Sequence, residues 1–193
     1  MIASPPQIVA PAAERVTCSI GAALRYRIPA NVILAVAEQE GGRPGQWVAN
    51  SNGTYDVGTL QFNTTYLRSL ARYGIGPEQV GRPGCYPYHL AAWRLRQHLL
   101  HDGGDVWTRA ANYHSRAPKL NAGYRASIMW RGARWASWLK ARWPSLSLAP
   151  VTQPVRPASA PKQTRRPPAL SNYEAGLRAA TEVPVVFSRG VAR

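Results

Sequence analysis

The chain has 193 residues, with 24 Lys and Arg against 9 Asp and Glu, which gives a formal net charge of +15. This length predicts one globular domain with an appendage, and a hydrophobic content of 45% excludes a wholly disordered chain. No run approaches the ~18 apolar residues of a membrane span, and neither a collagen repeat nor a sustained heptad is present. The basic excess favours an anionic partner, either nucleic acid, a membrane surface or an acidic polymer.

Composition divides the chain near Pro144. All 7 Trp lie before this residue, whereas the following stretch is rich in Pro, Ala and Arg. We therefore predict a domain over residues 10–144 and a disordered Pro/Arg-rich tail over residues 145–193, which is either a solvated linker or a segment that docks a partner. Residues 1–144 carry 17 basic and 7 acidic residues, so the domain itself has a charge of +10 and the tail contributes +5.

Periodic apolar positions predict a mainly helical domain. The expected helices cover residues 11–26, 29–40, 64–73, 87–101, 105–114 and 121–143. Between Val48 and Phe62 the pattern alternates around Asn52-Gly53, a strong signal for a tight turn, so we place a small β-hairpin there. Asn63 is expected to cap the third helix and Asp105 the fifth. The fold class is therefore mainly α, a helical domain with a small β-hairpin insertion.

The two cysteines, Cys18 and Cys85, have no metal-ligand spacing. From the residues alone they are either a disulfide that closes a long loop or two buried free thiols. The first fifteen residues have neither a basic region nor a continuous apolar stretch, so no signal peptide is recognisable.

Glu40 stands out among the few acidic residues of the domain. Helical spacing places Val36 and Ile33 on its face, so its carboxyl is expected at the edge of the core, whereas Glu38, about 200° further round, should face water. Burial and the negative end of a helix dipole both disfavour a charged carboxylate. A carboxyl that holds its proton near neutral pH can act as a general acid, although an isolated glutamate at a helix end is more often a surface residue.

The segment around Glu40 resembles the lytic transglycosylases of the lysozyme-like superfamily, especially those that accompany conjugation and type IV secretion machines. The resemblance rests on an ordered set of short motifs over roughly residues 14–130. They are Glu40-Gly41, Asn50, Asn52-Gly53-Thr54, Asp56, Gly58, Gln61, Asn63 and the block ANYHSRAP that contains Tyr113.

The resemblance implies that Glu40 is the single catalytic acid and then the base in cleavage of the β-1,4 bond between N-acetylmuramic acid and N-acetylglucosamine. It also implies a lysozyme-like α+β fold and a 1,6-anhydromuramyl product. Gln61 resembles the glutamine that lines the cleft, and Tyr113 the tyrosine that hydrogen-bonds near the catalytic carboxyl.

Four further residues are candidates for substrate binding, each with a structural alternative. Asp56 fits a turn-stabilising role, and Asn63 fits the helix cap. Gly58 suits either a backbone path beside sugar or a bulge in the hairpin. His114 either touches substrate or is a polar residue at the rim.

The sequence departs from the family at three of these motifs. Gly41 replaces the usual serine after the catalytic glutamate, and His114 replaces the usual asparagine after the tyrosine. The usual Gly-Leu-Met-Gln is here Gly58-Thr59-Leu60-Gln61.

The resemblance also pairs Cys18 with Cys85 and implies a location in the periplasm or cell envelope. The expected partners are peptidoglycan glycan strands and, through the tail, proteins of a secretion or conjugation apparatus. No metal, cofactor, membrane span or specific nucleic acid is expected.

Two alternatives stay open. A hydrolytic muramidase would use Glu40 with Asp56 as a second carboxyl across the cleft. A nucleic-acid-binding protein would use the arginines and tryptophans that interleave in residues 130–143, although the spacing of Trp135 and Leu139 is typical of a core.

Overall fold

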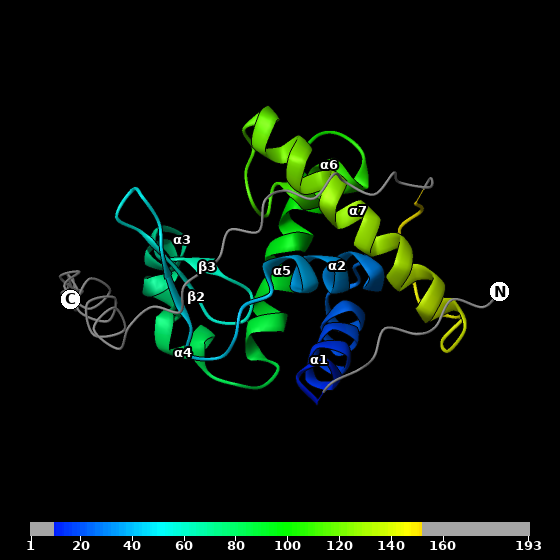
Figure 1. The fold of residues 1–193 in the computed structure, drawn as a ribbon, viewed down its shortest axis with the longest axis horizontal. Helices are drawn as coiled ribbons and strands as arrows, with labels where there is room; N and C mark the ends of the chain where they lie inside the picture. Colours follow the sequence, from blue (N-terminus) through cyan, green and yellow to red (C-terminus); the bar gives the residue numbers. More distant parts are fainter. Residues whose placement is uncertain (1–9, 152–193) are drawn as a thin grey trace, which may run out of the picture.

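The computed structural model describes residues 10–151, which form a group of helices with one small sheet at its side (Figure 1). In chain order the elements are α1 (Ala10–Tyr26), α2 (Ala30–Glu40), β1 (Trp47–Ala49), β2 (Tyr55–Val57), β3 (Phe62–Asn63), α3 (Thr64–Leu70), the 3₁₀ helix η1 (Ala71–Tyr73), α4 (Pro77–Gly81), α5 (Tyr86–His101), α6 (Val106–Ala111) and α7 (Pro118–Lys140). The mainly helical prediction is confirmed, and the ends of the expected helices differ from the observed ones by a few residues. The short helix α4 was not among the expected helices.

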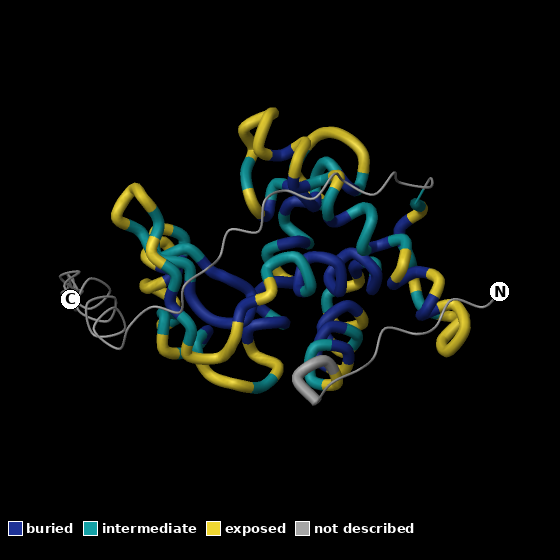
Figure 2. The backbone as a smooth tube through the Cα atoms, in the orientation of Figure 1, coloured by how far each residue is buried: buried dark blue, intermediate teal, exposed yellow. Residues whose placement is uncertain are grey.

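Helix α2 lies at the centre of the molecule and packs against α1, α5 and α7. Every residue from Ala30 to Ala37 is buried, so this helix has no solvent face over most of its length (Figure 2). It ends where Gly41 adopts the left-handed conformation, with φ of 57°, and its N–H bonds to the Ala37 carbonyl. Only the last turn of α2 reaches the surface.

The predicted hairpin is part of a three-stranded antiparallel sheet with strand order β1-β2-β3. Trp47 pairs with Val57 across the first two strands, and the turn between them contains Gly53 at φ of 78°. The third strand was not predicted because it is only two residues long, too short for an alternating pattern. It places Asn63 opposite Asp56.

The disulfide between Cys18 and Cys85 is present and joins residues 67 apart in sequence. Cys18 is buried in α1, and Cys85 immediately precedes α5. The bond therefore holds together two helices that also pack against each other.

The chain after α7 returns to the core. Asn31, fully buried in α2, forms two hydrogen bonds with Ala149: its Oδ1 accepts from the Ala149 N–H at 2.8 Å, and its Nδ2 donates to the Ala149 carbonyl at 3.0 Å. Trp107 Nε1 donates to the Pro150 carbonyl at 2.8 Å. The packed part of the chain thus continues past the compositional change at Pro144 to Val151, and the rest of the expected tail lies outside the described residues.

We predict that alanine substitutions at two glycines of α7 change the free energy of unfolding in opposite directions. A Cβ at Gly132 would come within 2.2 Å of Cη2 of the buried Trp107, whereas a Cβ at Gly123 would meet nothing within 4 Å. We expect Gly132→Ala to lower the free energy of unfolding by about 1–3 kcal/mol through overpacking. Gly123→Ala should raise it by about 0.5–1 kcal/mol because alanine is the better helix former. Urea denaturation measures both changes, and an equal stabilisation by the two alanines would contradict this packing.

Candidate active site

Glu40 is the last residue of α2, is half-buried, and accepts a hydrogen bond from α7. The hydroxyl of Tyr124 donates to Glu40 Oε1 at 2.5 Å. Tyr124 is only 8% exposed. Burial raises the pKa of Tyr124 well above 10.0, and the nearby Glu40 charge and the hydrogen bond raise it further. This hydroxyl therefore stays protonated and acts as a fixed donor to the carboxyl.

Tyr113, the tyrosine indicated by the family resemblance, follows α6 and lies in the same region. Its hydroxyl donates to the Leu60 carbonyl at 2.9 Å. Burial raises its pKa well above 10.0, with the Arg94 charge acting against this and the Glu40 charge adding to it. Tyr113 thus ties the region of Glu40 to the sheet, while the tyrosine seen to donate to the Glu40 carboxyl is Tyr124.

The helix expected over residues 121–143 contains Tyr124, but its contact with Glu40 was not predicted. The available signal was its hydroxyl, because a tyrosine on a buried helix face needs a hydrogen-bond partner. The partner could not be deduced from periodicity, since Tyr124 and Glu40 are 84 residues apart.

The chain after Glu40 packs closely on the turn that contains Gly58 and Gln61. The Gly42 N–H donates to the Thr59 carbonyl, and a Cβ on Gly42 would lie 2.2 Å from the Gly58 carbonyl oxygen. Gly58 has φ of 70°, and a Cβ there would come within 2.3 Å of the Val80 carbonyl oxygen. A glycine at position 58 is therefore required by the protein's own backbone.

Gln61 is 6% exposed and has φ of 49°, a left-handed conformation that is unusual for a residue with a side chain. Its Nε2 donates to the Gly58 carbonyl at 2.7 Å. The side chain thus closes the turn, and contact between Gln61 and a substrate stays a prediction.

Asn63 and Asp56 form a polar pair across β2 and β3. Asn63 Oδ1 accepts from the Thr65 N–H at 2.9 Å and so caps α3, as predicted. Asn63 Nδ2 donates to Asp56 Oδ1 at 3.0 Å and to Thr54 Oγ1 at 2.9 Å. Both ends of the Asn63 amide are therefore used within the fold, and Asp56 has a partner in the sheet.

His114 is exposed, and its ring lies parallel to that of Tyr124, with the ring centres 4.8 Å apart. Although the residue is exposed, the groups packed around its ring partly desolvate it and lower the pKa of His114 from 6.5; the Asp56 charge opposes this shift and the Arg94 charge adds to it. The neutral imidazole is therefore the main form at pH 7. It covers the tyrosine that donates to Glu40.

The prediction that Glu38 faces water is wrong. Its side chain is 24% exposed, and it accepts a hydrogen bond from Trp135 Nε1 at 2.7 Å and one from Arg134 at 3.3 Å. The helical wheel of α2 considers that helix alone, whereas in the structure α7 packs along the side of α2 that carries Glu38.

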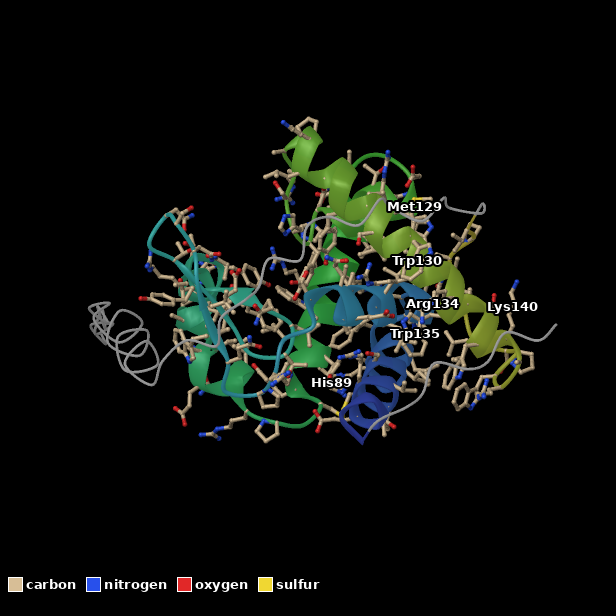
Figure 3. The ribbon with its side chains drawn as sticks, viewed as in Figure 1. His89, Met129, Trp130, Arg134, Trp135 and Lys140 are labelled. Carbon is tan, nitrogen blue, oxygen red and sulfur yellow. A yellow bond between two sulfur atoms is a disulfide. The ribbon has the colours of Figure 1, made fainter. Side chains whose placement is uncertain are left out.

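The tryptophans of α7 serve mainly as core. Trp135 and Trp138 are 7% and 8% exposed, so their rings are not available to stack on bases. Trp130 is half-buried, and the Arg134 guanidinium lies 4.8 Å from its ring centre, on the face of α7 shown in Figure 3. Two of the tryptophans that a nucleic-acid-binding protein would use to stack on bases are therefore buried, which disfavours this alternative.

The turn that carries Tyr113 and His114 is anchored by Asp102, at the end of α5. Asp102 accepts hydrogen bonds from Asn112, Arg116 and His98, at 2.8, 3.1 and 2.7 Å. Burial alone would raise the pKa of Asp102, but these three partners outweigh it and lower the pKa from 3.8 to about 2. One carboxylate thus holds both ends of the 112–116 turn.

No protein-family model matches the chain. The chain is similar to Protein IpgF of Shigella flexneri, with 30% identity over 102 residues, which cover 52% of this chain and 66% of that protein. It is also similar to Invasion protein IagB of Salmonella typhimurium, with 25% identity over 99 residues, or 51% of this chain and 61% of that protein. The chain therefore spans less than two thirds of either curated relative. These matches are distant and carry no information on the subgroup.

Among residues 10–151, no helix is long and apolar enough to cross a membrane.

We predict that replacing Asp102 changes how the free energy of unfolding depends on pH. Because its pKa is lower in the native state than in the unfolded state, its stabilising effect is complete above about pH 4 and is lost as the pH falls toward 2. We expect Asp102→Asn to be less stable than the wild type at pH 6, with a difference that shrinks toward pH 2. Urea unfolding at several pH values measures this, and a difference that does not vary with pH would contradict it.

Proposed function

We propose that the chain is a peptidoglycan lytic transglycosylase that cleaves the β-1,4 bond between N-acetylmuramic acid and N-acetylglucosamine. The observation that carries the proposal is the pairing of Glu40 with Tyr124 at the one end of a buried helix that reaches the surface. The ordered motifs around Glu40 and the distant relatives support the same family.

In the proposed reaction Glu40 acts twice. Its protonated carboxyl gives a proton to the glycosidic oxygen, and the N-acetylglucosamine side leaves with the bonding electrons. The muramyl 6-hydroxyl then attacks the anomeric carbon while the Glu40 carboxylate removes the hydroxyl proton. A 1,6-anhydro ring forms, Glu40 regains its proton, and no water is consumed.

Tyr124 supports both steps by positioning Glu40. Its donated hydrogen bond fixes one carboxyl oxygen, while the raised tyrosine pKa prevents Tyr124 from competing as a base near neutral pH. A fixed carboxyl orientation lowers the cost of reaching the transition state because less motion is lost during the reaction.

The contacts of Asp56 favour this mechanism over hydrolysis by two carboxyls. Asp56 accepts from Asn63 across the sheet, a role that its place in the hairpin already explains. A hydrolytic muramidase that uses Glu40 with Asp56 is the second candidate, and nothing in the contacts of Asp56 favours it.

The proposed setting is local opening of the cell wall for a secretion or conjugation apparatus, in the periplasm or cell envelope. The Cys18–Cys85 disulfide supports an oxidising compartment. The name of one relative, Invasion protein IagB, is compatible with a process at the cell envelope. We also propose that residues 152–193, which are rich in Pro and Arg, contact proteins of that apparatus.

Glu40→Gln tests the proposed catalytic acid. We expect this variant to lose at least 1,000-fold in activity, about the size of a general-acid contribution, because an amide cannot supply the proton. The measurement is clearing of purified peptidoglycan in a zymogram and in solution. Glu78→Gln, on an exposed carboxylate of α4, is the matched control and should clear normally. Equal clearing by Glu40→Gln and the wild type would reject the assignment.

Tyr124→Phe tests the positioning role of the tyrosine. Loss of a hydrogen bond to a charged group costs about 1.5–3 kcal/mol, so we expect kcat to fall about 10- to 100-fold with little change in KM. The exposed Tyr73 provides the control variant Tyr73→Phe. A Tyr124→Phe enzyme with unchanged kcat and an unchanged melting temperature would show that the hydrogen bond has no part in the reaction.

A further inference from the structure

The guanidinium group of Arg94, on α5, lies over two aromatic rings. Its carbon lies 4.1 Å from the ring centre of Tyr66, on α3, and 4.5 Å from the ring centre of Tyr113. Phe62 packs against both rings, with centre-to-centre distances of 6.2 and 6.3 Å. The position of the guanidinium group is thus restricted by aromatic side chains from separate elements.

The edge of this guanidinium group has no protein acceptor within residues 10–151. The Arg94 side chain forms no hydrogen bond or ion pair there, and its nitrogen atoms are not fully buried. The residue is half-buried, so these N–H groups remain within reach of solvent. Other arginines nearby differ, since Arg116 pairs with Asp102 and Arg96 donates to the Tyr26 carbonyl.

Arg94 lies in the region of the candidate catalytic residue. It stacks on Tyr113, the ring of the adjacent His114 lies 4.8 Å from that of Tyr124, and the Tyr124 hydroxyl donates to Glu40. The charges of Arg94 and Glu40 both act on Tyr113 and on Tyr124, and the charge of Arg94 also acts on His114.

We propose that Arg94 forms a carboxylate-binding subsite next to Glu40, which recognises acidic groups on the glycan strand; this rests on the proposed function. A guanidinium edge binds a carboxylate through two parallel N–H donors. Stacking on the rings of Tyr66 and Tyr113 restricts the position of this group, so less conformational freedom is lost on binding. The site selects strands that carry carboxylates over neutral polysaccharides of the same backbone.

Two sources could supply the carboxylate. One is the lactyl group of muramic acid, which is a free carboxylate where the peptide has been removed. The other is the stem peptide, whose acidic residues carry carboxylates when the peptide is present. The basic charge of the domain favours either source without choosing between them.

The test measures binding of three ligands to the full chain carrying Glu40→Gln, so that no ligand is cleaved. The ligands are a neutral N-acetylglucosamine oligomer, glycan strands freed of peptide by an amidase, and strands that retain their stem peptides. Arg94→Gln and Arg94→Met are compared with Arg72→Gln, because Arg72 also stacks on a tyrosine, at 4.8 Å from the Tyr73 ring centre, on an exposed part of the chain.

We expect both Arg94 variants to bind carboxylate-bearing strands at least 10-fold more weakly and the neutral oligomer unchanged, while Arg72→Gln binds all three like the parent. A loss on amidase-treated strands identifies the lactyl carboxylate, and a loss confined to peptide-bearing strands identifies the stem peptide. An equal loss on charged and neutral ligands would overturn the proposal by showing that Arg94 only supports its two tyrosines, and unchanged binding throughout would overturn it as well.

Cleavage of peptidoglycan by the chain with Glu40 intact separates this proposal from the proposed function. If that chain cleaves and the Arg94 variants bind all ligands normally, the subsite is wrong and the function stands. If that chain neither cleaves nor binds any strand, the proposed function fails and the subsite fails with it.

Discussion

The burial of α2 from Ala30 to Ala37 is the constraint on which the rest of the structure depends. A helix with no polar face can be stable only when neighbours cover it on every side, and here α1, α5 and α7 do so. Its apolar length ends at Ala37, so the polar residues that follow must lie where the covering stops. Glu40 therefore stands at the border between the core and the surface, where one carboxyl oxygen meets a buried tyrosine.

The last turn of α2 is held by α7 at each of its three polar positions. Consecutive side chains on a helix point about 100° apart. A single neighbouring helix can therefore contact Glu38, Gln39 and Glu40 only if it runs alongside this last turn. The observed hydrogen-bonded pairs are Glu38 with Trp135, Gln39 with Ser127, and Glu40 with Tyr124. Helix α7 thus packs the core and also fixes the direction of the candidate catalytic carboxyl.

Close backbone contacts extend this arrangement to the sheet. Gly42 allows the chain beyond α2 to lie directly on the 58–61 turn, and Tyr113 bonds to the Leu60 carbonyl in that turn. The Asp102 carboxylate in turn fixes the loop that carries Tyr113. The position of Glu40 relative to the sheet therefore depends on glycines and buried hydrogen bonds more than on long side chains.

Much of this fold could be predicted from local sequence patterns. Apolar periodicity located the long helices, the Asn52-Gly53 turn located the hairpin, and Asn63 was assigned as a cap because such signals act within a few residues. The contact of Tyr124 with Glu40 could not be predicted in this way, since it joins positions 84 residues apart. The wrong prediction that Glu38 faces water has a similar cause. A helical wheel describes one helix alone and gives no information on which neighbouring helix packs against it.

The chain beyond Pro144 shows the limit of composition as a guide. Its prolines suggested that the domain ends there, yet the backbone of Ala149 pairs with the buried amide of Asn31. A buried amide needs two partners, and nothing in the local sequence indicates that they come from 118 residues away.

The central claim is that Glu40 alone performs both proton transfers, with no attacking water. Mass spectrometry of the fragments released from purified peptidoglycan tests this claim most directly. The account predicts muramyl ends in the 1,6-anhydro form, lighter by one water than the hydrolysed form. Fragments with ordinary reducing muramyl ends would contradict it and would assign hydrolysis to this site.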